Sequence, residues 1–138
     1  MASLTKSLVQ ILLGILIVAM FKCGKGEGIM YRRVKVQIIN NLTQPQDLTL
    51  HCKSKTDDRG EHTIKIGETY EFKFWPNFFY RATLYFCSFW WQSNSSFHHF
   101  DIYDQKRDSC VLCTWKILEI GACTYYPAEG TYTDCYRW

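Results

Sequence analysis

The sequence is poor in several features that define other protein classes. It has only 3 prolines and 8 glycines in 138 residues. It contains no repeat, low-complexity tract or linker, so it indicates no internal domain boundary. A long apolar run occurs only near the N-terminus, so no spanning helix is expected further along. The 16 basic and 13 acidic residues nearly balance, which argues against a nucleic-acid-binding protein, because such proteins present a basic face.

The N-terminus has the pattern of a secretory leader. Lys6 precedes a nearly continuous apolar run over residues 8–21. That run is shorter than the roughly 20 apolar residues that a spanning helix needs, so it fits the core of a signal peptide better than a membrane anchor. We therefore expect a signal peptide over residues 1–24, with cleavage between Cys23 and Gly28. A single secreted domain over residues 25–138, without stable membrane insertion, is expected to follow.

The cysteines point to the same compartment. The sequence has 7 cysteines, of which Cys23 is expected to leave with the leader. The even number that remains in a short exported chain predicts a disulfide framework. Its members are Cys52, Cys87, Cys110, Cys113, Cys123 and Cys135. Two sequons, beginning at Asn41 and Asn94, are supporting evidence for an extracellular glycoprotein.

Local spacing favours one of the possible disulfide pairs. If residues 128–130 form a three-residue hairpin loop ending in glycine, Cys123 falls opposite Cys135, and we expect these two to be bridged. The pairing of the other four cysteines is not fixed by the sequence. We favour an arrangement in which Cys110 and Cys113 each bridge to a different strand, so that Cys52 and Cys87 are their partners.

Short alternating segments make up the rest of the chain. Apolar and polar residues alternate with a period of two, as in half-buried strands, and no segment after the leader keeps a helical period. Segment 82–91 is apolar on both faces, which suggests a central strand. About eight such segments, spaced roughly 8 to 12 residues apart, predict an all-β sandwich or barrel.

Two charged segments lie beside cysteines in this pattern. Residues 53–60 form a charged turn after Cys52, and residues 104–108 form a charged loop before Cys110. Because loops on a rigid scaffold commonly carry function, we expect both segments to present side chains for recognition. The candidates are Lys55, Asp57, Asp58, Arg59, Asp104, Lys106, Arg107 and Asp108.

Aromatic residues offer a second candidate surface. Phe78, Phe79, Tyr80, Trp90 and Trp91 have the chemistry to stack on sugars or on a peptide, although most aromatic residues of a sheet protein belong to its core. Trp90 and Trp91 are adjacent in a strand and must therefore point to opposite faces.

Catalytic and metal-binding patterns are weak. Four histidines are of the type that supplies an acid–base pair in ribonucleases, namely His51, His62, His98 and His99, but the chain is too short for the fold of the secreted ribonucleases. The pair Cys110 and Cys113 supplies only half of a zinc site, and the acidic residues of the 53–60 turn lack the spacing of a calcium loop. We expect no enzyme, no metal and no other cofactor.

Several motifs together carry a family resemblance. They are His51-Cys52-Lys53-Ser54-Lys55 with Asp57-Asp58-x-Gly60, then Tyr85-Phe86-Cys87, Phe100-Asp101-x-Tyr103-Asp104 with Arg107-Asp108, and Cys110 with Cys113-x-Trp115. In this order they resemble the signature of the plant self-incompatibility S-protein homologues, over roughly residues 34–138. Two departures are Arg59, where the family usually has leucine, and Cys123 with Cys135, which are additional to its usual four cysteines.

The resemblance implies a fold and a function. The fold is a small, disulfide-stapled antiparallel β-sandwich. The function is that of a secreted recognition ligand, as in pollen–pistil self-incompatibility or related cell–cell communication, binding as a monomer to a plasma-membrane receptor ectodomain. The alternative from another class is a secreted antimicrobial or membrane-active defence protein, which the near-neutral charge of the chain disfavours. A secreted ribonuclease or a lectin is a weaker alternative.

Overall fold

The computed structural model describes residues 5–15, 31–126 and 131–138, with the side chains of residues 94–96, 126 and 131–133 excepted. The chain divides into residues 1–31 and residues 32–138. In the first unit, residues 5–15 form a helix. No helix in the described part of the chain is long and apolar enough to cross a membrane. The expected cleavage region between Cys23 and Gly28 lies outside the described residues, so the leader stays a prediction.

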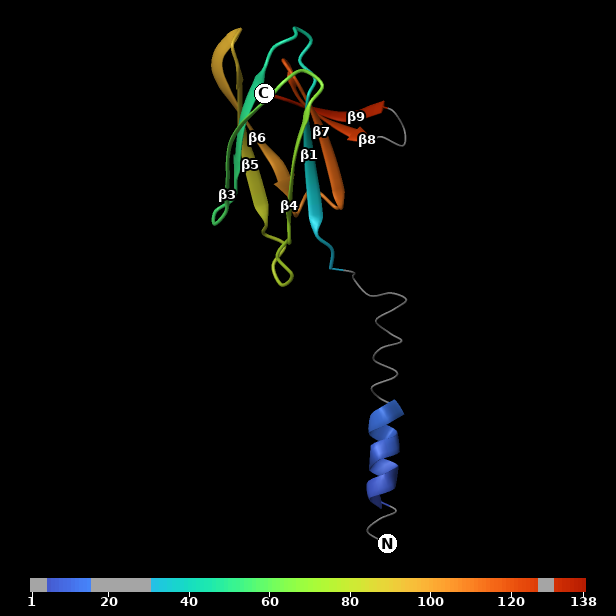
Figure 1. Ribbon diagram of the computed structural model, residues 1–138. Helices are drawn as coiled ribbons and strands as arrows, with labels where there is room; N and C mark the ends of the chain where they lie inside the picture. Colours follow the sequence, from blue (N-terminus) through green and yellow to red (C-terminus); the bar gives the residue numbers. More distant parts are fainter. Residues whose placement is uncertain (1–4, 16–30, 127–130) are drawn as a thin grey trace. The chain divides into compact units, whose positions relative to one another are not determined.

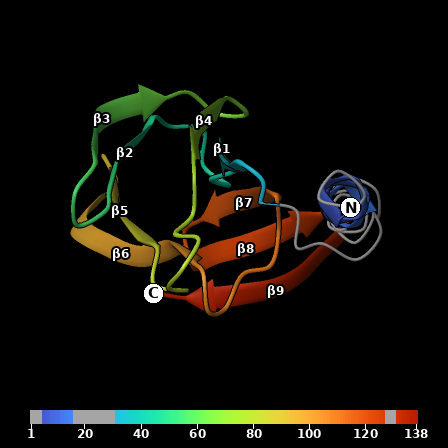
Figure 2. The ribbon, with the colours of Figure 1, turned by 90° about the horizontal axis from the view of Figure 1, so that it is seen from below.

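The second unit is a β-sandwich (Figure 1). Its described residues form nine strands: β1 Val34–Asn40, β2 Leu48–Lys53, β3 Asp58–Ile64, β4 Thr69–Phe74, β5 Leu84–Trp91, β6 Asn94–Asp104, β7 Leu112–Leu118, β8 Gly121–Tyr126 and β9 Thr131–Arg137. One sheet has the order β4-β1-β7-β8-β9 and the other the order β3-β2-β5-β6. The end-on view in Figure 2 shows the two sheets facing each other. The all-β sandwich expected above is confirmed, with the single parallel pair β1–β7 among antiparallel ones.

The core fills the space between the sheets. Strand β1 alternates buried and half-buried residues, with Val36 and Ile38 inside, and β5 does the same with Phe89 inside. Trp115 of β7 is 2% exposed and is among the largest fully packed side chains. Full burial of an aliphatic or aromatic side chain contributes about 1.5–3 kcal/mol, so these inner rows supply most of the stability. As expected, β5 is a central strand, between β2 and β6.

The β8–β9 hairpin places Cys123 opposite Cys135 as expected, although its register is not uniform. Tyr126 pairs with Thr131, and a β-bulge between Cys123 and Tyr125 then shifts the register by one residue. Cys123 consequently faces Cys135, and the two are joined by a disulfide. The expected hairpin loop, residues 128–130, lies outside the described residues.

The other two disulfides overturn the expected partners. Cys52 of β2 faces Cys87 of β5, and these two are bridged. Cys110 is bridged to Cys113, three residues away. The expectation that Cys110 and Cys113 each reach a different strand is therefore wrong. The reason is strand order, because β2 pairs with β5 and so places Cys52 directly opposite Cys87.

Candidate recognition surface

Three connections meet at one end of the sandwich, which we call the loop end. They are residues 54–57 between β2 and β3, residues 75–83 between β4 and β5, and residues 105–111 between β6 and β7. β1 also begins there, because its first residue pairs with the last residue of β4. The loop end is at the bottom of the sandwich in Figure 1. Both charged segments expected to serve recognition therefore lie at the same end of the molecule.

Arg59 does not extend into solvent. Its Nη2 donates a 2.7 Å hydrogen bond to the carbonyl oxygen of Lys73, and its guanidinium lies 5.3 Å from the ring centre of Phe72. Arg59 belongs to β3 in one sheet, whereas Lys73 and Phe72 belong to β4 in the other. Arg59 therefore ties the two sheets together along one edge of the sandwich.

Asp57 is the ion-pair partner of this arginine. Its Oδ2 lies 2.8 Å from Nε of Arg59 and accepts a 2.6 Å hydrogen bond from the hydroxyl of Tyr85. Burial, followed by the hydrogen bond to Asp57, raises the pKa of Tyr85 above its ordinary value. The Asp57 carboxylate thus binds partners within the protein, and these contacts hold the turn against the core.

Asp58 makes a separate set of local contacts. Its Oδ1 accepts a 2.8 Å hydrogen bond from the backbone N–H of Gly60 and lies 2.5 Å from Nε2 of His51. The Gly60 N–H, followed by His51, lowers the pKa of Asp58 below its ordinary value. Gly60 itself has a positive φ of 76°, a conformation that glycine adopts without strain. Asp58 therefore stabilises the start of β3.

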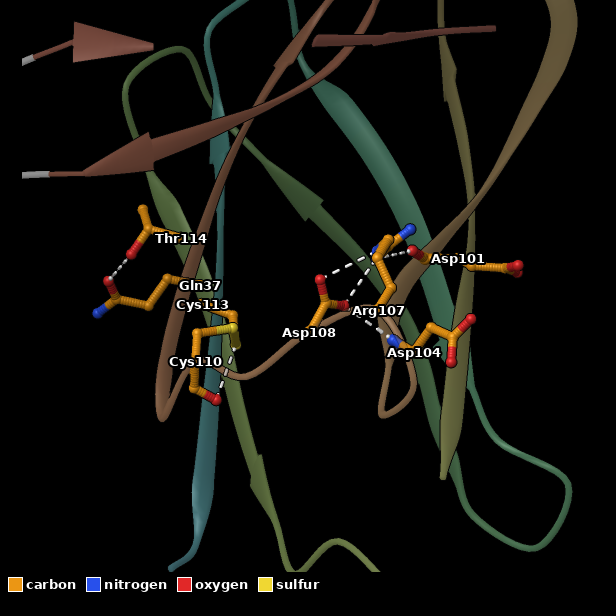
Figure 3. Close-up of a disulfide and its surroundings, with 8 residues drawn as sticks. All are labelled: Gln37, Asp101, Asp104, Arg107, Asp108, Cys110, Cys113 and Thr114. Atoms are coloured by element: carbon orange, nitrogen blue, oxygen red, sulfur yellow. Dashed lines mark hydrogen bonds and ion pairs between the residues drawn. A yellow bond between two sulfur atoms is a disulfide. The ribbon is translucent and has the colours of Figure 1, made fainter. Parts of the chain in front are cut away.

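Arg107 holds the second charged segment inward (Figure 3). Its Nε and Nη2 donate hydrogen bonds of 3.0 and 2.8 Å to the two carboxylate oxygens of Asp108. Nη2 also donates a 2.7 Å hydrogen bond to the carbonyl oxygen of Asp101. The guanidinium lies over three rings, with ring-centre distances of 5.2 to 5.4 Å, namely Phe100, Trp115 and Tyr136. Bidentate pairing and cation–π contact together make this a structural arginine.

The rest of the 104–111 segment is fixed by the same network. Asp108 Oδ2 accepts a 2.9 Å hydrogen bond from the Asp104 backbone N–H, and Asp104 Oδ1 accepts one of 3.0 Å from the Lys106 backbone N–H. The disulfide between Cys110 and Cys113 constrains the end of this segment (Figure 3). The loop is therefore held from both ends.

The β4–β5 connection is also well tied, although it is rich in apolar residues. Asn77 Oδ1 accepts 3.0 Å hydrogen bonds from the backbone N–H groups of Phe79 and Tyr80. Gln105, from the neighbouring connection, donates to the Asn77 carbonyl oxygen at 2.9 Å and accepts from the Thr83 N–H at 3.1 Å. These bonds join the two connections and fix the backbone that carries the aromatic side chains.

Those aromatic side chains face solvent. Trp75, Phe78, Phe79 and Tyr80 are 57%, 61%, 84% and 73% exposed. An open groove of about 740 Å³ is lined by residues of this connection and of the 54–56 turn, Trp75 and Lys55 among them. We call Phe78, Phe79 and Tyr80 the aromatic tip. Sequence reasoning named these residues but could not tell that they are exposed, because Tyr, Phe and Trp also fill the core.

The eight charged candidates thus separate into three groups. Asp57, Arg59, Arg107 and Asp108 are engaged in ion pairs within the fold. Asp58 and Asp104 accept backbone hydrogen bonds in their own segments. Lys55 and Lys106 have exposed side chains at the loop end. Among these candidates, the lysines are therefore presented to solvent beside the aromatic rings, whereas Arg59, Arg107 and the carboxylates maintain the loops.

Two of the histidines considered for an acid–base pair, His51 and His98, point to opposite sides of their sheet. His51 belongs to the outer set of β2 and contacts Asp58. His98 pairs with the fully buried Phe89, and its ring stacks on Trp91 and on Trp138 at 4.9 Å each. His51 and His98 therefore lie on opposite faces of one sheet and cannot serve one reacting group. His99 lies on the outer face with His51, where both pair with Ser88 of β5. In the described residues, no group of three or more His, Cys, Asp or Glu is placed to hold a metal ion.

The two sequons lie elsewhere. Asn41 is half-buried after β1, and the hydroxyl of its sequon residue Thr43 is 3.0 Å from a carboxylate oxygen of Glu119. Asn94 begins β6, but its side chain lies outside the described residues. Glycosylation at either position stays a prediction.

Comparisons with known proteins agree with this fold. The plant self-incompatibility protein S1 family matches residues 35–138. The chain is similar to S-protein homolog 5 of Arabidopsis thaliana, with 40% identity over 121 residues that cover 86% of this chain and 89% of the relative. S-protein homolog 2 of the same plant is 44% identical over 110 residues, which cover 75% of this chain and 66% of that relative.

A solved structure shares the fold. It comes from the SPH (self-incompatibility protein homologue) proteins, described as a widespread family of small, highly stable, secreted proteins from plants. The TM-score is 0.55 at 14% identity, and the match covers 80% of this chain and 93% of the other. At that identity the likeness concerns the fold alone.

Proposed function

The chain belongs to the plant self-incompatibility protein S1 family, and we propose that it acts as a secreted recognition ligand that binds the ectodomain of a cell-surface receptor. The leader-like N-terminus and the three disulfides support secretion, because disulfides form and persist in oxidising compartments. The process served is pollen–pistil self-incompatibility or related communication between plant cells. The ligand acts as a monomer, and no bond is made or broken.

One observation carries this proposal: three loops from different parts of the chain are tied into a single preformed end. Gln105 joins the β6–β7 connection to Asn77 and Thr83 of the β4–β5 connection. Arg59, at the start of β3, bonds to the Lys73 carbonyl oxygen at the end of β4. A rigid surface loses little conformational entropy on association, so more of the contact free energy appears as affinity. Lys55 and Lys106 are charged residues in two of these loops that face a partner.

Cell-surface binding tests the proposal. Protein purified from the medium of a secreting host is labelled and added to plant cells. We expect saturable binding that falls strongly when the cells are first treated with a protease, because the receptor is a protein. Binding that survives protease treatment at full strength would contradict a protein receptor.

Matched variants locate the surface. Lys55→Glu combined with Lys106→Glu reverses the charge of both exposed lysines and leaves the ion pairs that hold the loops in place. We expect binding to fall several-fold. Lys65→Glu reverses a charge in the β3–β4 connection at the opposite end and should leave binding unchanged. Equal affinity of both variants and the parent protein would exclude the loop end as the receptor surface.

A further inference from the structure

The two ends of the sandwich differ in charge. Cationic residues in the connections and the β1 start at the loop end are Arg32, Arg33, Lys55, Arg81, Lys106 and Arg107. In the described connections at this end the acidic residues are Asp57 and Asp108, and each is ion-paired with an arginine. Asp58 and Asp104 lie beside these connections, at the ends of β3 and β6. At the opposite end, the connections carry Asp47, Glu68 and Glu119 against Lys65. The loop end is thus positive and the opposite end negative, although the whole chain is close to neutral.

The most exposed apolar residues of the sandwich lie at its positive end. Phe79 is 84% exposed and its neighbour Phe78 is 61% exposed. The two rings pack edge to face, with their centres 5.2 Å apart. Single exposed apolar residues are ordinary, but a contiguous exposed cluster marks a surface that binds something. Because Asn77 accepts hydrogen bonds from this backbone, the cluster is presented by an ordered loop.

The order of residue types along the loop indicates what it binds. Two phenylalanines lie at the tip, Tyr80 follows them, and Arg81 comes next. In a lipid interface, phenyl rings enter the acyl boundary, Tyr and Trp rings lie at the headgroup level, and Arg and Lys contact the phosphates. A basic segment at a membrane surface is attracted to anionic lipids in addition.

We propose that the loop end docks peripherally on a bilayer that carries anionic headgroups, with Phe78 and Phe79 inserted at the interface. A protruding tip with its apolar residues outermost fits a soft, flat partner, whereas the adjoining groove has a mixed lining with Ser54, Thr56 and Asn77 among its polar residues. The docking is separate from receptor recognition, since it requires lipid alone. It also differs from membrane attack, since the bilayer stays intact.

Co-sedimentation with protein-free vesicles tests the proposal. Protein from the medium of a secreting host is mixed with phosphatidylcholine vesicles containing about 30% phosphatidylserine, and separately with phosphatidylcholine alone. We expect binding to the anionic vesicles that weakens at high salt, because surface electrostatics are screened. The double variant Phe78→Ser, Phe79→Ser should bind about tenfold more weakly or worse, because it removes both inserted rings.

Two matched controls separate the tip from general stickiness. Phe97→Ser removes a side chain that is 60% exposed on β6, outside the loop end, and should keep full vesicle binding. Arg81→Glu should weaken binding several-fold, whereas Lys65→Glu at the opposite end should not. Thermal unfolding of each variant must match the parent protein, which excludes misfolding as the cause.

Specific results would overturn the proposal. Absence of binding to either kind of vesicle would do so, as would equal binding of the tip variant. Pelleting with insoluble polygalacturonate instead of vesicles would assign the basic aromatic surface to an acidic polysaccharide. A concentration-dependent dimer that the tip variant abolishes would assign it to a second copy of the chain. None of these results bears on protease-sensitive binding to cells, so the receptor proposal can fail or hold independently.

Discussion

The charged segments and the aromatic tip lie at the same end of the sandwich and use their side chains in opposite ways. Arg59 and Arg107 turn inward, pair with aspartates and lie over core aromatic rings. Phe78 and Phe79 turn outward and remain exposed. The common assumption that charge marks the contact surface and apolar side chains the core is therefore reversed here. What decides the outcome is whether a side chain finds partners between the sheets.

The largest expected effect comes from removing Arg107. Its side chain is 27% exposed and that of its partner Asp108 is 13% exposed. Arg107→Met leaves a carboxylate poorly solvated and unpaired, so we expect the free energy of unfolding to fall by about 2–3 kcal/mol, less than for a fully buried pair. Denaturant unfolding measures this. Lys106→Met, one residue away and exposed, should change stability by less than about 0.5 kcal/mol, and similar losses for the two variants would contradict a structural role for Arg107.

Removing Arg59 should have a smaller effect of the same kind. Arg59→Met loses the hydrogen bond to the Lys73 carbonyl oxygen and the ion pair to Asp57. The side chain of Asp57 is 41% exposed, so water compensates part of the loss, and we expect about 1–2 kcal/mol. The same unfolding experiment applies, with Lys55→Met as the exposed control. Hydrogen exchange should also quicken at the facing edges of β3 and β4, and unchanged exchange there would argue against a tie between the sheets.

Replacing Asp58 should change the free energy of unfolding by less than replacing Arg59 does, and the change should depend on pH. Its pKa is lowered from the ordinary value of 3.8 by the Gly60 N–H and then by His51. A carboxyl group whose pKa is lower in the folded state contributes stability above its unfolded pKa and loses it as the pH falls through the folded pKa. The stability difference between the parent protein and Asp58→Asn should therefore be present at about pH 5 and shrink as the pH falls through the folded-state pKa of Asp58. Glu61→Gln controls for the loss of a surface carboxylate, and a difference that persists at low pH would contradict the assignment.

The aromatic tip should have the smallest effect on stability. Phe79→Ser removes a ring that is 84% exposed, so we expect the free energy of unfolding to change by less than about 0.5 kcal/mol. Thermal or denaturant unfolding checks this. Phe74→Ser, which removes a ring that is 5% exposed in β4, should in contrast be strongly destabilising. A large loss for Phe79→Ser would mean that the ring packs in solution and is not displayed.

Part of the fold could be read from local sequence pattern. The period-two alternation around Ile38 and Phe89 marks the inner faces of two strands, because side chains of a strand alternate between faces. The same alternation places Trp91 inside, at 4% exposure, and leaves Trp90 partly exposed. The facing positions of Cys123 and Cys135 also follow from one hairpin. These inferences concern residues of one strand or of consecutive strands, but the equally local bridge between Cys110 and Cys113 was not expected.

Inferences that needed distant strands failed. Cys52 and Cys87 are 35 residues apart, and only the pairing of β2 with β5 brings them together. Arg59 has a charged side chain within a charged turn, so nothing local reveals that the β4 carbonyl lies in reach. The inward turn of Arg107 likewise depends on rings from β6, β7 and β9.

The sequence by itself determined the all-β class, the strands and the cysteine framework, because hydrophobic periodicity and turn chemistry act over a few residues. Only the tertiary structure decided which charged residues remain available to a partner and which aromatic residues stay in solvent. The physical reason is that a charge or a ring gains more from a desolvated, well-oriented partner than from water. Whether such a partner exists at the loop end depends on which strands the two sheets place side by side.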